Sequence, residues 1–352
     1  MKILHIIFSF KIGGSETMLA DIINQQVRRH EVTLCVINHL YDEELLATID
    51  KRAKIILLHR IPGSRNLLDV FRLNYWVHHK RFHVIHCHES NIQKYIVFRF
   101  RLTSVLTVHG ICLPIEGIEH YKTIVSISRS VKDDLEKRGI NNSKVIYNGI
   151  HSELVMPANH LFLDKIPNIR ILQIGRLEHS VKGQHVSLEA LSILTKRFPS
   201  YNIHLTFMGE GASDRFLKYL SKKMRIGKQV YFEGKCTREY IYSHIRDYDI
   251  LVQPSLIEGF GLTVVEAMTA GIPVLVSDID GPMEIISNGE CGFFFRHNDS
   301  ADMANRLIYM IEHREIVHAM VEKGKVRAQN FTLNNMIDKY EQIYSDVNIS
   351  TN

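Results

Sequence analysis

Two acidic residues, Glu258 and Glu266, bracket a glycine turn in the C-terminal half of the chain. A carboxylate repels phosphate and accepts hydrogen bonds, so each acid is expected to face a group that donates them, such as a hydroxyl of a sugar or a ribose. A single acid near a helix start commonly only complements the helix dipole or stays solvated. Two acids around one glycine turn instead favour a pair that binds a polyhydroxylated ligand.

An anion site is predicted beside these two acids. Residues 249–254 form an apolar run that ends at a proline, which is typical of a buried parallel strand, and residues 262–270 are helix-forming. The first N–H groups of a helix have no partner within it and favour a negatively charged ligand. The backbone amides predicted to bind a phosphate here are those of Gly261, Leu262 and Thr263.

The segments that must position this turn alternate between strand and helix. In the first half, helical stretches separate most of the apolar strands, which we expect near 2–8, 31–37, 54–59, 84–87, 104–108 and 123–127. In the second half, strands are expected near 169–174, 205–208, 230–232, 249–254 and 274–277. This alternation predicts an α/β fold with doubly wound parallel sheets, whose ligands bind at the carboxyl ends of the strands.

The chain is long enough, at 352 residues, for two domains with separate cores. Residues 151–167 contain two prolines and no clear periodicity, so we interpret them as a linker. The expected division is therefore an N-terminal domain at 1–150, a second domain at 168–330 and a C-terminal helix within 331–352.

Composition excludes several classes of protein. Hydrophobic residues make up 45% and charged residues 23%, which excludes disordered and collagen-like chains. A net charge of +5 is too mild and scattered to predict a nucleic-acid partner, although it suits anionic substrates or an anionic membrane surface. The five cysteines include no Cys-x-x-Cys pair, and the apolar run 1–8 is too short for a signal peptide. We therefore expect a reduced, cytoplasmic protein without a structural zinc site.

Histidines gather at two strand ends of the first half. His86, His88 and Glu89 lie at the end of the fourth expected strand, and His109 follows the fifth. Alternate strand residues share a face, so the first group could be read as metal ligands. No third spaced cluster completes such a site in the sequence, and we expect no metal. Taken by itself, His109 is interpreted as a strand-end histidine satisfied by the backbone.

Other turns in the first half carry weaker signals. Gly13 and Gly14 follow the first strand, and paired glycines allow a backbone to approach a ligand closely, although many tight turns contain such a pair without one. Ser15 and Ser128 are expected to cap the helices that they precede. Residues 145–150 are expected to contain the last strand of the first domain and the turn that follows it.

The segment 258–266 reads Glu-Gly-Phe-Gly-Leu-Thr-Val-Val-Glu. It resembles the Glu-x7-Glu signature of the retaining glycosyltransferases called family 4 or glycosyl transferases group 1. The resemblance implies the GT-B fold, in which two Rossmann-like domains face a central cleft and a C-terminal helix returns to the first domain. Companion motifs in the family's order extend it over nearly the whole chain: Gly13-Gly14-Ser15-Glu16, Thr107-Val-His-Gly110, Asn148-Gly-Ile150 and Gly209-Glu-Gly211. One departure is His151, which stands where the family has an aspartate.

The resemblance implies a role for each motif of the second domain. Arg176 and Lys182 stand where the family places two cations that hold the donor diphosphate, and Gly209 lies in a turn near the phosphates or the base. Glu258 is expected to hold the hydroxyls of the donor sugar, and Glu266 those of the ribose. In the first domain, His109 is implied to contact the donor hexose, and Gly13 and Gly14 to approach it.

The function that the resemblance implies is transfer of a hexose or N-acetylhexosamine from a nucleotide sugar, expected to be a UDP-sugar, to an acceptor hydroxyl with retained configuration. The expected acceptor is a lipid-linked glycan of a capsule, a lipopolysaccharide O-antigen or an exopolysaccharide. No metal or other cofactor is expected, because basic side chains and helix amides do its work. Basic and aromatic stretches at 76–82 and 98–102 would allow a peripheral position on the cytoplasmic face of a membrane.

Two alternatives remain open. A nucleotide-sugar 2-epimerase of the same architecture would use the nucleotide without an acceptor, and a non-catalytic protein would bind the donor without turnover. A dehydrogenase is disfavoured because Gly-x-Gly-x-x-Gly is absent after the first strand. Donor sugar, acceptor, linkage and oligomeric state are not determined by any motif, because pocket details read hydroxyl stereochemistry.

Overall fold

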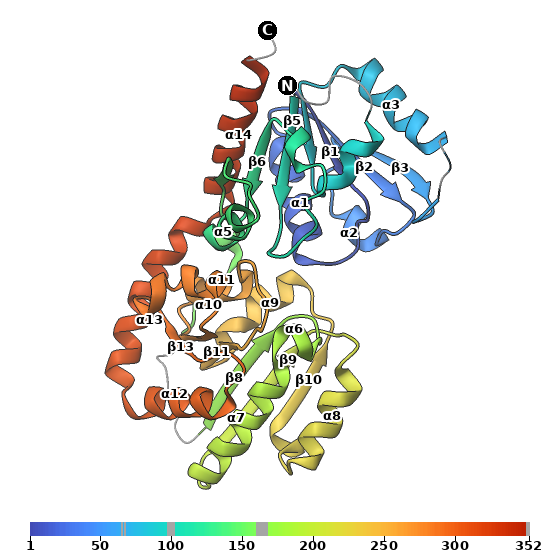
Figure 1. The fold of residues 1–352 in the computed structure, drawn as a ribbon. Coiled ribbons are helices and arrows are strands. Elements are labelled where there is room, and N and C mark those ends of the chain that lie inside the picture. Colours follow the sequence, from blue (N-terminus) through green and yellow to red (C-terminus); the bar gives the residue numbers. More distant parts are fainter. Residues whose placement is uncertain (65, 67, 97–102, 160–167, 350–352) are drawn as a thin grey trace. The chain divides into compact units, whose positions relative to one another are not determined.

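The computed structural model describes residues 1–64, 66, 68–96, 103–159 and 168–349 of the chain. They form two compact units (Figure 1). Unit 1 comprises Met1–Gly149 and Leu333–Asn352, and unit 2 comprises Ile150–Thr332. The chain therefore leaves unit 1 once and returns to it for its last helix.

Unit 1 is built on a seven-stranded parallel sheet with the order β3-β2-β1-β4-β5-β6-β7. Most of these strands are buried along nearly their whole length, which explains why they are continuous apolar runs rather than alternating patterns. The strands are β1 (Lys2–Ile7), β2 (Glu31–Asn38), β3 (Lys54–Arg60), β4 (Val84–Cys87), β5 (Ser104–Val108), β6 (Thr123–Ser126) and β7 (Ser143–Val145).

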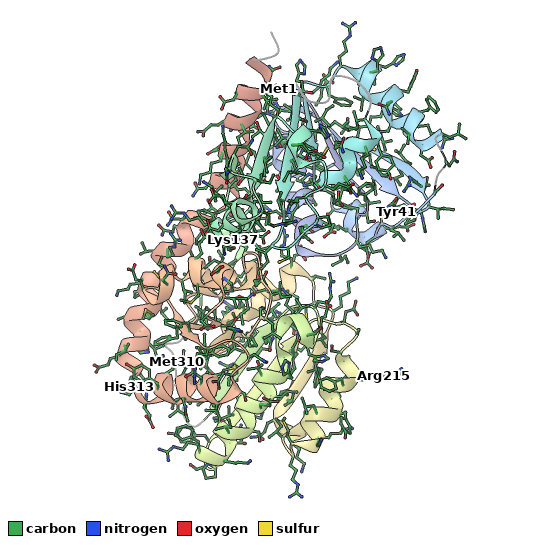
Figure 2. All side chains as sticks on the ribbon, viewed as in Figure 1. Met1, Tyr41, Lys137, Arg215, Met310 and His313 are labelled. Atoms are coloured by element: carbon green, nitrogen blue, oxygen red, sulfur yellow. The ribbon has the colours of Figure 1, made fainter. Side chains whose placement is uncertain are left out.

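All but the last of the helices of unit 1 lie between its strands in the sequence, and side chains fill the space around the sheet (Figure 2). They are α1 (Gly14–Gln26), α2 (Glu43–Ala47), α3 (Leu68–Lys80), α5 (Arg129–Lys137) and α14 (Leu333–Ile349), with short 3-10 helices η1 (Ser90–Tyr95) and η2 (Ile118–His120). Helix α14 packs on α1 and β4, and it buries Tyr340 and Tyr344. Residues from the far end of the sequence thus complete the core of unit 1.

Unit 2 is built on a six-stranded parallel sheet with the order β10-β9-β8-β11-β12-β13. Its central strand β11 is buried at every residue, as expected for a strand covered on both faces. The strands are β8 (Asn168–Ile174), β9 (Asn202–Met208), β10 (Val230–Gly234), β11 (Ile250–Gln253), β12 (Val274–Ser277) and β13 (Phe293–Phe295). Two doubly wound parallel sheets confirm the predicted fold class.

Helices of unit 2 follow the strands in alternation (Figure 1). Leu191 and Leu307, from two of these helices, lie with Phe207 of β9 in one buried hydrophobic cluster. The helices are α6 (His179–Lys182), α7 (Gln184–Arg197), α8 (Asp214–Lys223), α9 (Arg238–His244), α10 (Leu262–Ala270), α11 (Asp280–Ile285), α12 (Ser300–Glu312) and α13 (Arg314–Ala328).

The local predictions were confirmed at some helix ends and wrong at others. Ser128 caps α5, because its hydroxyl accepts a hydrogen bond from the N–H of Val131 at 3.1 Å. Ser15 does not cap α1: the cap position is Gly13, and the Ser15 hydroxyl donates to Glu16 instead. The last strand of unit 1 spans Ser143–Val145, so it precedes most of the segment 145–150 in which a strand and a turn were expected.

Candidate functional site

Each sheet reverses its strand order at one point, between β1 and β4 in unit 1 and between β8 and β11 in unit 2. In open α/β sheets, ligands bind beyond the carboxyl ends of the strands at such a switch point, because the connections diverge there to opposite faces. The residues that follow these four strands are therefore the ones on which a site would be built.

The switch point of unit 2 brings Lys182 and Glu258 into direct contact. Lys182 is the last residue of α6, and Glu258 lies in the turn between β11 and α10. The Lys182 Nζ donates to the Glu258 Oε2 at 2.6 Å, and the Gln253 Nε2 donates to the same oxygen at 3.1 Å. The two charged side chains are 28% and 16% exposed, so the pair is only partly shielded from water. One oxygen of Glu258 is thus held by two donors.

Arg176 follows β8 and remains largely exposed. Its side chain is 65% exposed, and its Nη1 lies 3.9 Å from a carboxylate oxygen of Glu178. Its backbone is held, because the Gln184 Nε2 donates to the Arg176 carbonyl at 2.8 Å. The backbone of Arg176 is therefore anchored while the guanidinium extends into solvent.

The turn before α10 depends on Gly261, whose φ of +113° lies in the region that side chains rarely adopt. A Cβ at this position would lie only 2.9 Å from the Gln253 Oε1. Glycine therefore allows Gln253, the residue that holds Glu258, to pack against the start of the helix. The N–H groups of Leu262 and Thr263 belong to the first turn, where helix amides have no helical acceptor.

Glu266 lies one turn into α10 and is 8% exposed. Burial raises the pKa of its carboxyl to about 7, an effect that the charge of Arg238 partly offsets. Burying this carboxyl costs free energy when it is charged. Acids with strongly shifted pKa values concentrate at functional sites, so Glu266, in the helix that follows β11 at the switch point, is a candidate functional residue.

Gly209 directly follows β9 and lies against Gly175, which directly follows β8. Its φ is +140°, and a Cβ there would collide with the carbonyl of Gly175. Its N–H donates to the carbonyl of Gly234 at 2.7 Å. This glycine keeps the loops after three strands close together, so its structural role is clear from the backbone alone.

The switch point of unit 1 is lined by histidines. His5 on β1 is paired in register with His86 on β4, and His88 follows β4 directly. His109 follows β5, and its Nε2 lies 2.9 Å from the Nδ1 of His88. Burial lowers the pKa of His5 and of His109 to about 4. Burial and neighbouring histidines lower the pKa of His86 and His88 well below the usual value.

The sequence suggested His86, His88 and Glu89 as possible metal ligands, and the structure groups the two histidines with His5 instead of with Glu89. Ligand atoms of His5, His86 and His88 lie within 4.8 Å of one another. Both ring nitrogens of each of the three already have hydrogen-bond partners, and a metal would have to displace them. This geometry favours a hydrogen-bonded cluster, and the absence of a metal stays a prediction.

Gly13 and Gly14 lie at the start of α1, after β1 of the same switch point. Gly13 has an extended backbone with φ of −167°, which any residue can adopt. The Thr17 hydroxyl donates to the Gly13 carbonyl at 2.6 Å and stabilises this helix start. The backbone conformation at Gly13 alone therefore does not demand glycine.

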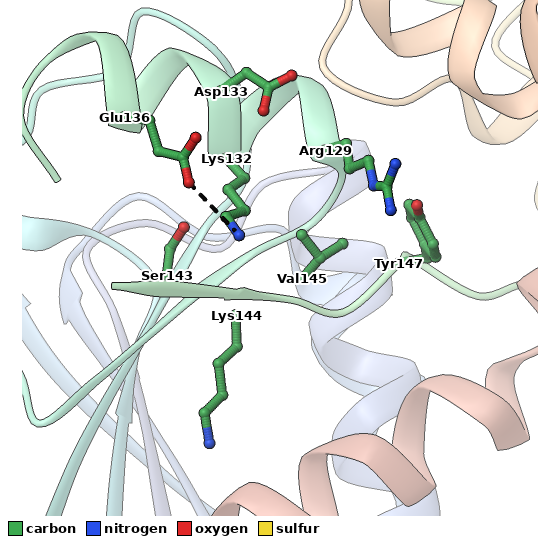
Figure 3. A pocket seen from close by; sticks show the side chains of 8 residues that line it. All are labelled: Arg129, Lys132, Asp133, Glu136, Ser143, Lys144, Val145 and Tyr147. Carbon is green, nitrogen blue, oxygen red and sulfur yellow. Dashed lines mark ion pairs between the residues drawn. The ribbon is translucent and has the colours of Figure 1, made fainter. Parts of the chain in front are cut away.

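A hollow of about 720 Å³ lies at the edge of the unit 1 sheet, away from the switch point of that sheet (Figure 3). It runs between α5 and the edge strand β7, and Lys132 pairs there with Glu136 at 3.5 Å. Figure 3 shows Lys144 pointing away from α5. None of the candidate site residues lines this hollow: its walls are Arg129, Lys132, Asp133, Glu136, Ser143, Lys144, Val145 and Tyr147.

Three residues at the two switch points were missed by the sequence analysis. Gln253 holds Glu258, Gln26 contacts His5, and Tyr344 contacts His86 at 2.6 Å. Gln253 ends a strand just before the glycine turn, so its position could have indicated it. Gln26 and Tyr344 lie in ordinary amphipathic helices, and nothing in their local sequence distinguishes them from core or surface residues.

Comparison with known families covers both units. Residues 164–327 match the family described as glycosyl transferases group 1, and residues 12–154 match the one described as glycosyltransferase family 4. Each unit is thus similar to a glycosyltransferase family over most of its length. The two matches agree with the resemblance carried by residues 258–266 and its companion motifs.

Named relatives match different parts of this chain. EpsD of Bacillus subtilis (strain 168) is 32% identical over 164 residues, which are 47% of this chain and 42% of that protein. Phosphatidyl-myo-inositol mannosyltransferase of Mycobacterium leprae (strain TN) is 24% identical over 294 residues, 78% of this chain and 76% of that protein. The chain spans about half the length of several curated relatives that it matches, EpsD among them.

Solved structures share the fold over the full length. HepE of Anabaena superposes with a TM-score of 0.82 at 20% identity, covering 98% of this chain and 99% of HepE. Sucrose-phosphate synthase of Thermosynechococcus elongatus gives 0.79 at 16% identity and covers 99% of each chain. At these identities the likeness shows the GT-B fold.

Proposed function

We propose that this protein transfers a hexose or N-acetylhexosamine from a nucleotide sugar to an acceptor hydroxyl, with retention of configuration. The observation that carries the proposal is the Lys182–Glu258 contact of 2.6 Å beside the amide-bearing start of α10, at the switch point of unit 2. A cation, free helix amides and acids at one sheet edge suit a ligand that combines phosphate with hydroxyl groups.

The basic groups would hold the donor diphosphate. Negative charge grows on the leaving nucleoside diphosphate as the glycosidic bond breaks, and fixed cations and dipoles stabilise that charge more in the transition state than in the ground state. Lys182 is positioned by Glu258, whereas the exposed Arg176 would leave its ion pair with Glu178 to reach the phosphates. The amides of Leu262 and Thr263 complete the proposed diphosphate site.

The two acids would bind sugar hydroxyls on either side of the diphosphate. Glu258 has one oxygen engaged by Lys182 and Gln253, so its other oxygen is proposed to accept from the donor sugar. Glu266 is proposed to accept from the ribose. Hydroxyl donors favour the ionised carboxylate, so binding of the nucleotide should lower the raised pKa of Glu266.

The nucleotide is proposed to be UDP, and the acceptor a lipid-linked glycan. Structures of HepE contain UDP, UDP with glucose, or UDP-glucose, and they share this chain's fold. Among the relatives, the name of the Mycobacterium leprae protein specifies a mannosyltransferase acting on phosphatidyl-myo-inositol. These names support a UDP-sugar and a lipid-borne acceptor in surface-polysaccharide synthesis as the first substrates to assay. No metal is proposed, because the cations and amides of the site supply the positive charge.

The first test is a binding screen of nucleotide sugars, followed by transfer to lipid-linked acceptors. Lys182→Ala and Glu258→Ala should each reduce transfer by at least a hundredfold, since both groups act at the reacting centre. Lys222→Ala, on the exposed side of α8, removes an equal charge away from the site and serves as the control. Wild-type transfer rates in a folded Lys182 or Glu258 variant would overturn the site, and a product with inverted anomeric configuration would overturn retention.

The epimerase alternative is separated by acceptor dependence. A transferase releases nucleoside diphosphate only when acceptor is supplied, whereas a nucleotide-sugar 2-epimerase forms an isomeric product without one. A non-catalytic protein would bind the donor yet give no product over a panel of acceptors. The same assay mixtures with and without acceptor therefore discriminate all three functions.

We also propose that α3 brings the protein to an anionic membrane surface. Leu68, Phe71 and Tyr75 occupy one face of this helix and are 62%, 68% and 58% exposed. Basic Arg72 and Lys80 are exposed on the same helix. Trp76, suggested from the sequence as a membrane contact, is instead half-buried beneath Lys54, whose Nζ lies 3.8 Å from the ring centroid. The other suggested stretch, 98–102, lies outside the described residues.

Flotation with vesicles tests this surface. Phe71→Asp should reduce binding to vesicles that contain anionic phospholipid, because it replaces apolar area with a repelled charge. Tyr219→Asp, on a similarly exposed aromatic of α8, is the matched control and should bind like wild type. None of the helices among the described residues has both the length and the hydrophobicity to cross a bilayer. Equal flotation of wild type and Phe71→Asp would contradict an interfacial role for α3.

A further inference from the structure

One buried side-chain amide, that of Gln26, contacts the histidine cluster of unit 1. The Gln26 side chain, at the end of α1, is 1% exposed. Its Oε1 lies 2.8 Å from the Nε2 of His5, and its Nε2 donates to the Tyr344 hydroxyl at 3.3 Å. From this amide a chain of ring contacts runs from His5 to His88 at 3.2 Å and from His88 to His109 at 2.9 Å.

The chemistry of the amide sets the proton on each ring. An amide oxygen can only accept, so the Nε2 of His5 must carry the hydrogen. The rings are neutral because burial disfavours the imidazolium, so the Nδ1 of His5 accepts and the Nε2 of His88 must donate to it. By the same step, the Nδ1 of His88 accepts from the Nε2 of His109. The Nδ1 of His109 is then left with a lone pair.

His109, the last ring in this series of hydrogen bonds, distinguishes the arrangement from the one with every donor and acceptor exchanged. Turning the Gln26 amide by 180° would reverse every donor and place a hydrogen on the Nδ1 of His109. That atom is buried and, among the described residues, has no hydrogen-bond partner. Buried N–H groups without an acceptor are rarer than acceptors that are under-used, so the lone-pair arrangement is favoured.

The hydrogen bond from the Gln26 amide nitrogen to Tyr344 supports the same orientation of the amide. The Tyr344 hydroxyl accepts from the amide nitrogen and can donate to the Nδ1 of His86 at 2.6 Å. The Nε2 of His86 then donates to the Thr107 hydroxyl at 2.7 Å. Both ring nitrogens of His86 then have a hydrogen-bond partner, and Tyr344 links α14 to the histidine cluster.

We propose that Gln26, His5 and His88 are positioning residues that hold His109 as its Nε2–H tautomer, so that its buried Nδ1 is offered to a ligand as a hydrogen-bond acceptor. The ligand group that it takes must therefore be a donor, and among uncharged groups a hydroxyl fits best. A carboxylate or phosphate oxygen would place two acceptors together and is excluded. The identification of this hydroxyl as one of a sugar rests on the proposed function.

The test measures the tautomer directly and needs no substrate. The full-length protein is labelled with ¹⁵N-histidine, and long-range proton–nitrogen correlation distinguishes a protonated from an unprotonated ring nitrogen. The His109 signals are assigned by their loss in His109→Gln. At pH 7.5 the wild-type protein should show a protonated Nε2 and an unprotonated Nδ1 at His109. The Nδ1–H tautomer in the wild type would overturn the proposal.

Variants of Gln26, the first residue of this series of hydrogen bonds, provide the second test. Gln26→Leu removes the acceptor, so the His109 Nδ1 signal should shift toward the protonated range. Gln26→Glu retains an acceptor for His5 and should keep the wild-type tautomer, which a role in packing alone would not predict. Gln25→Leu, the same change one residue earlier on α1, is the matched control. An unchanged His109 tautomer in Gln26→Leu would also overturn the proposal; if that variant does not fold, the wild-type tautomer decides.

Substrate assays then separate this inference from the proposed function. If transfer is found, Gln26→Leu should raise KM for the donor more than it lowers kcat, with rescue by Gln26→Glu. If no transfer is found with any acceptor, the tautomer measurement still stands, because it reports on the free protein. The two ideas can therefore fail independently.

Discussion

The two acids beside the glycine turn are held in different electrostatic states. Glu258 is paired with Lys182 and partly exposed, so its charge is compensated. Glu266 is buried, and burial raises the pKa of its carboxyl to about 7. A side chain that only stabilised the fold would not need an ionisable group in this position. We propose that Glu266 is buried at a cost in stability because its role is to bind a ligand.

Replacing Glu266 with glutamine should therefore stabilise the protein at high pH. The folded-state pKa is raised from 4.5 to about 7, so the folded form binds the extra proton and stability falls as pH rises between these values. Glu266→Gln removes this loss, which amounts to about 3 kcal/mol at about 1.4 kcal/mol per pKa unit. Denaturant unfolding of both proteins at pH 4 and pH 8 measures it.

The pH dependence is what makes this prediction specific. At pH 4 the wild type and Glu266→Gln should be nearly equal in stability, because the Glu266 carboxyl is then largely protonated in both the folded and the unfolded protein. A gain in Glu266→Gln that is the same at both pH values would show improved packing rather than a lost ionisation cost. In the same variant, affinity for the nucleotide should fall.

At the scale of elements, the start of α10 combines an unusual backbone with a tight contact. Gly261 has φ of +113°, and its missing Cβ leaves space for the Gln253 amide. Strand β11, helix α10 and the turn between them thus position Glu258 and the first amides of α10. The geometry of this turn depends on glycine at position 261.

Gly261→Ala should destabilise the protein by roughly 2–3 kcal/mol, of which ~1–2 kcal/mol comes from the left-handed backbone and the rest from the displaced Gln253 side chain. Gly234→Ala is the matched control, since its φ is +76° but a Cβ there meets nothing within 4 Å. It should show the backbone cost alone. Equal losses in the two variants, measured by urea unfolding, would argue against the Gln253 contact.

At the scale of the whole molecule, unit 1 carries an unusual load of neutral, buried histidines. His5 and His109 have pKa values lowered to about 4 by burial, and the pKa values of His86 and His88 are lowered as well. Glu89 acts in the opposite sense, because burial raises its pKa to about 8. The histidines outnumber this acid, so acid pH should destabilise unit 1.

Unit 1 should lose on the order of 3 kcal/mol of stability as pH falls from 6.5 to 4. In this window an unfolded histidine takes up a proton while its buried counterpart does not, so the unfolded state gains. The chain's single tryptophan, Trp76, lies in α3 of unit 1 and reports its unfolding by fluorescence. Denaturant midpoints that stay constant from pH 6.5 to 4 would contradict buried, neutral histidines.

The sequence by itself determined the elements and the order in which they follow one another. The strand at 84–87, the strand at 104–108 and the helix at 262–270 were predicted with the bounds that the structure has, because apolar runs and glycine stops are local signals. The loops after β8 and β11 could be marked as candidate sites for the same reason, since the doubly wound pattern places strand ends at one edge.

Only the tertiary structure decided which side chains meet. Lys182 and Glu258 are 76 residues apart and touch, while His86 and Tyr344, 258 residues apart, share a hydrogen bond. No local pattern encodes such pairs, because they arise from the strand order at each switch point and from the return of α14 to unit 1. Whether a carboxyl is charged or a histidine neutral follows from that packing, since burial and partners set the pKa.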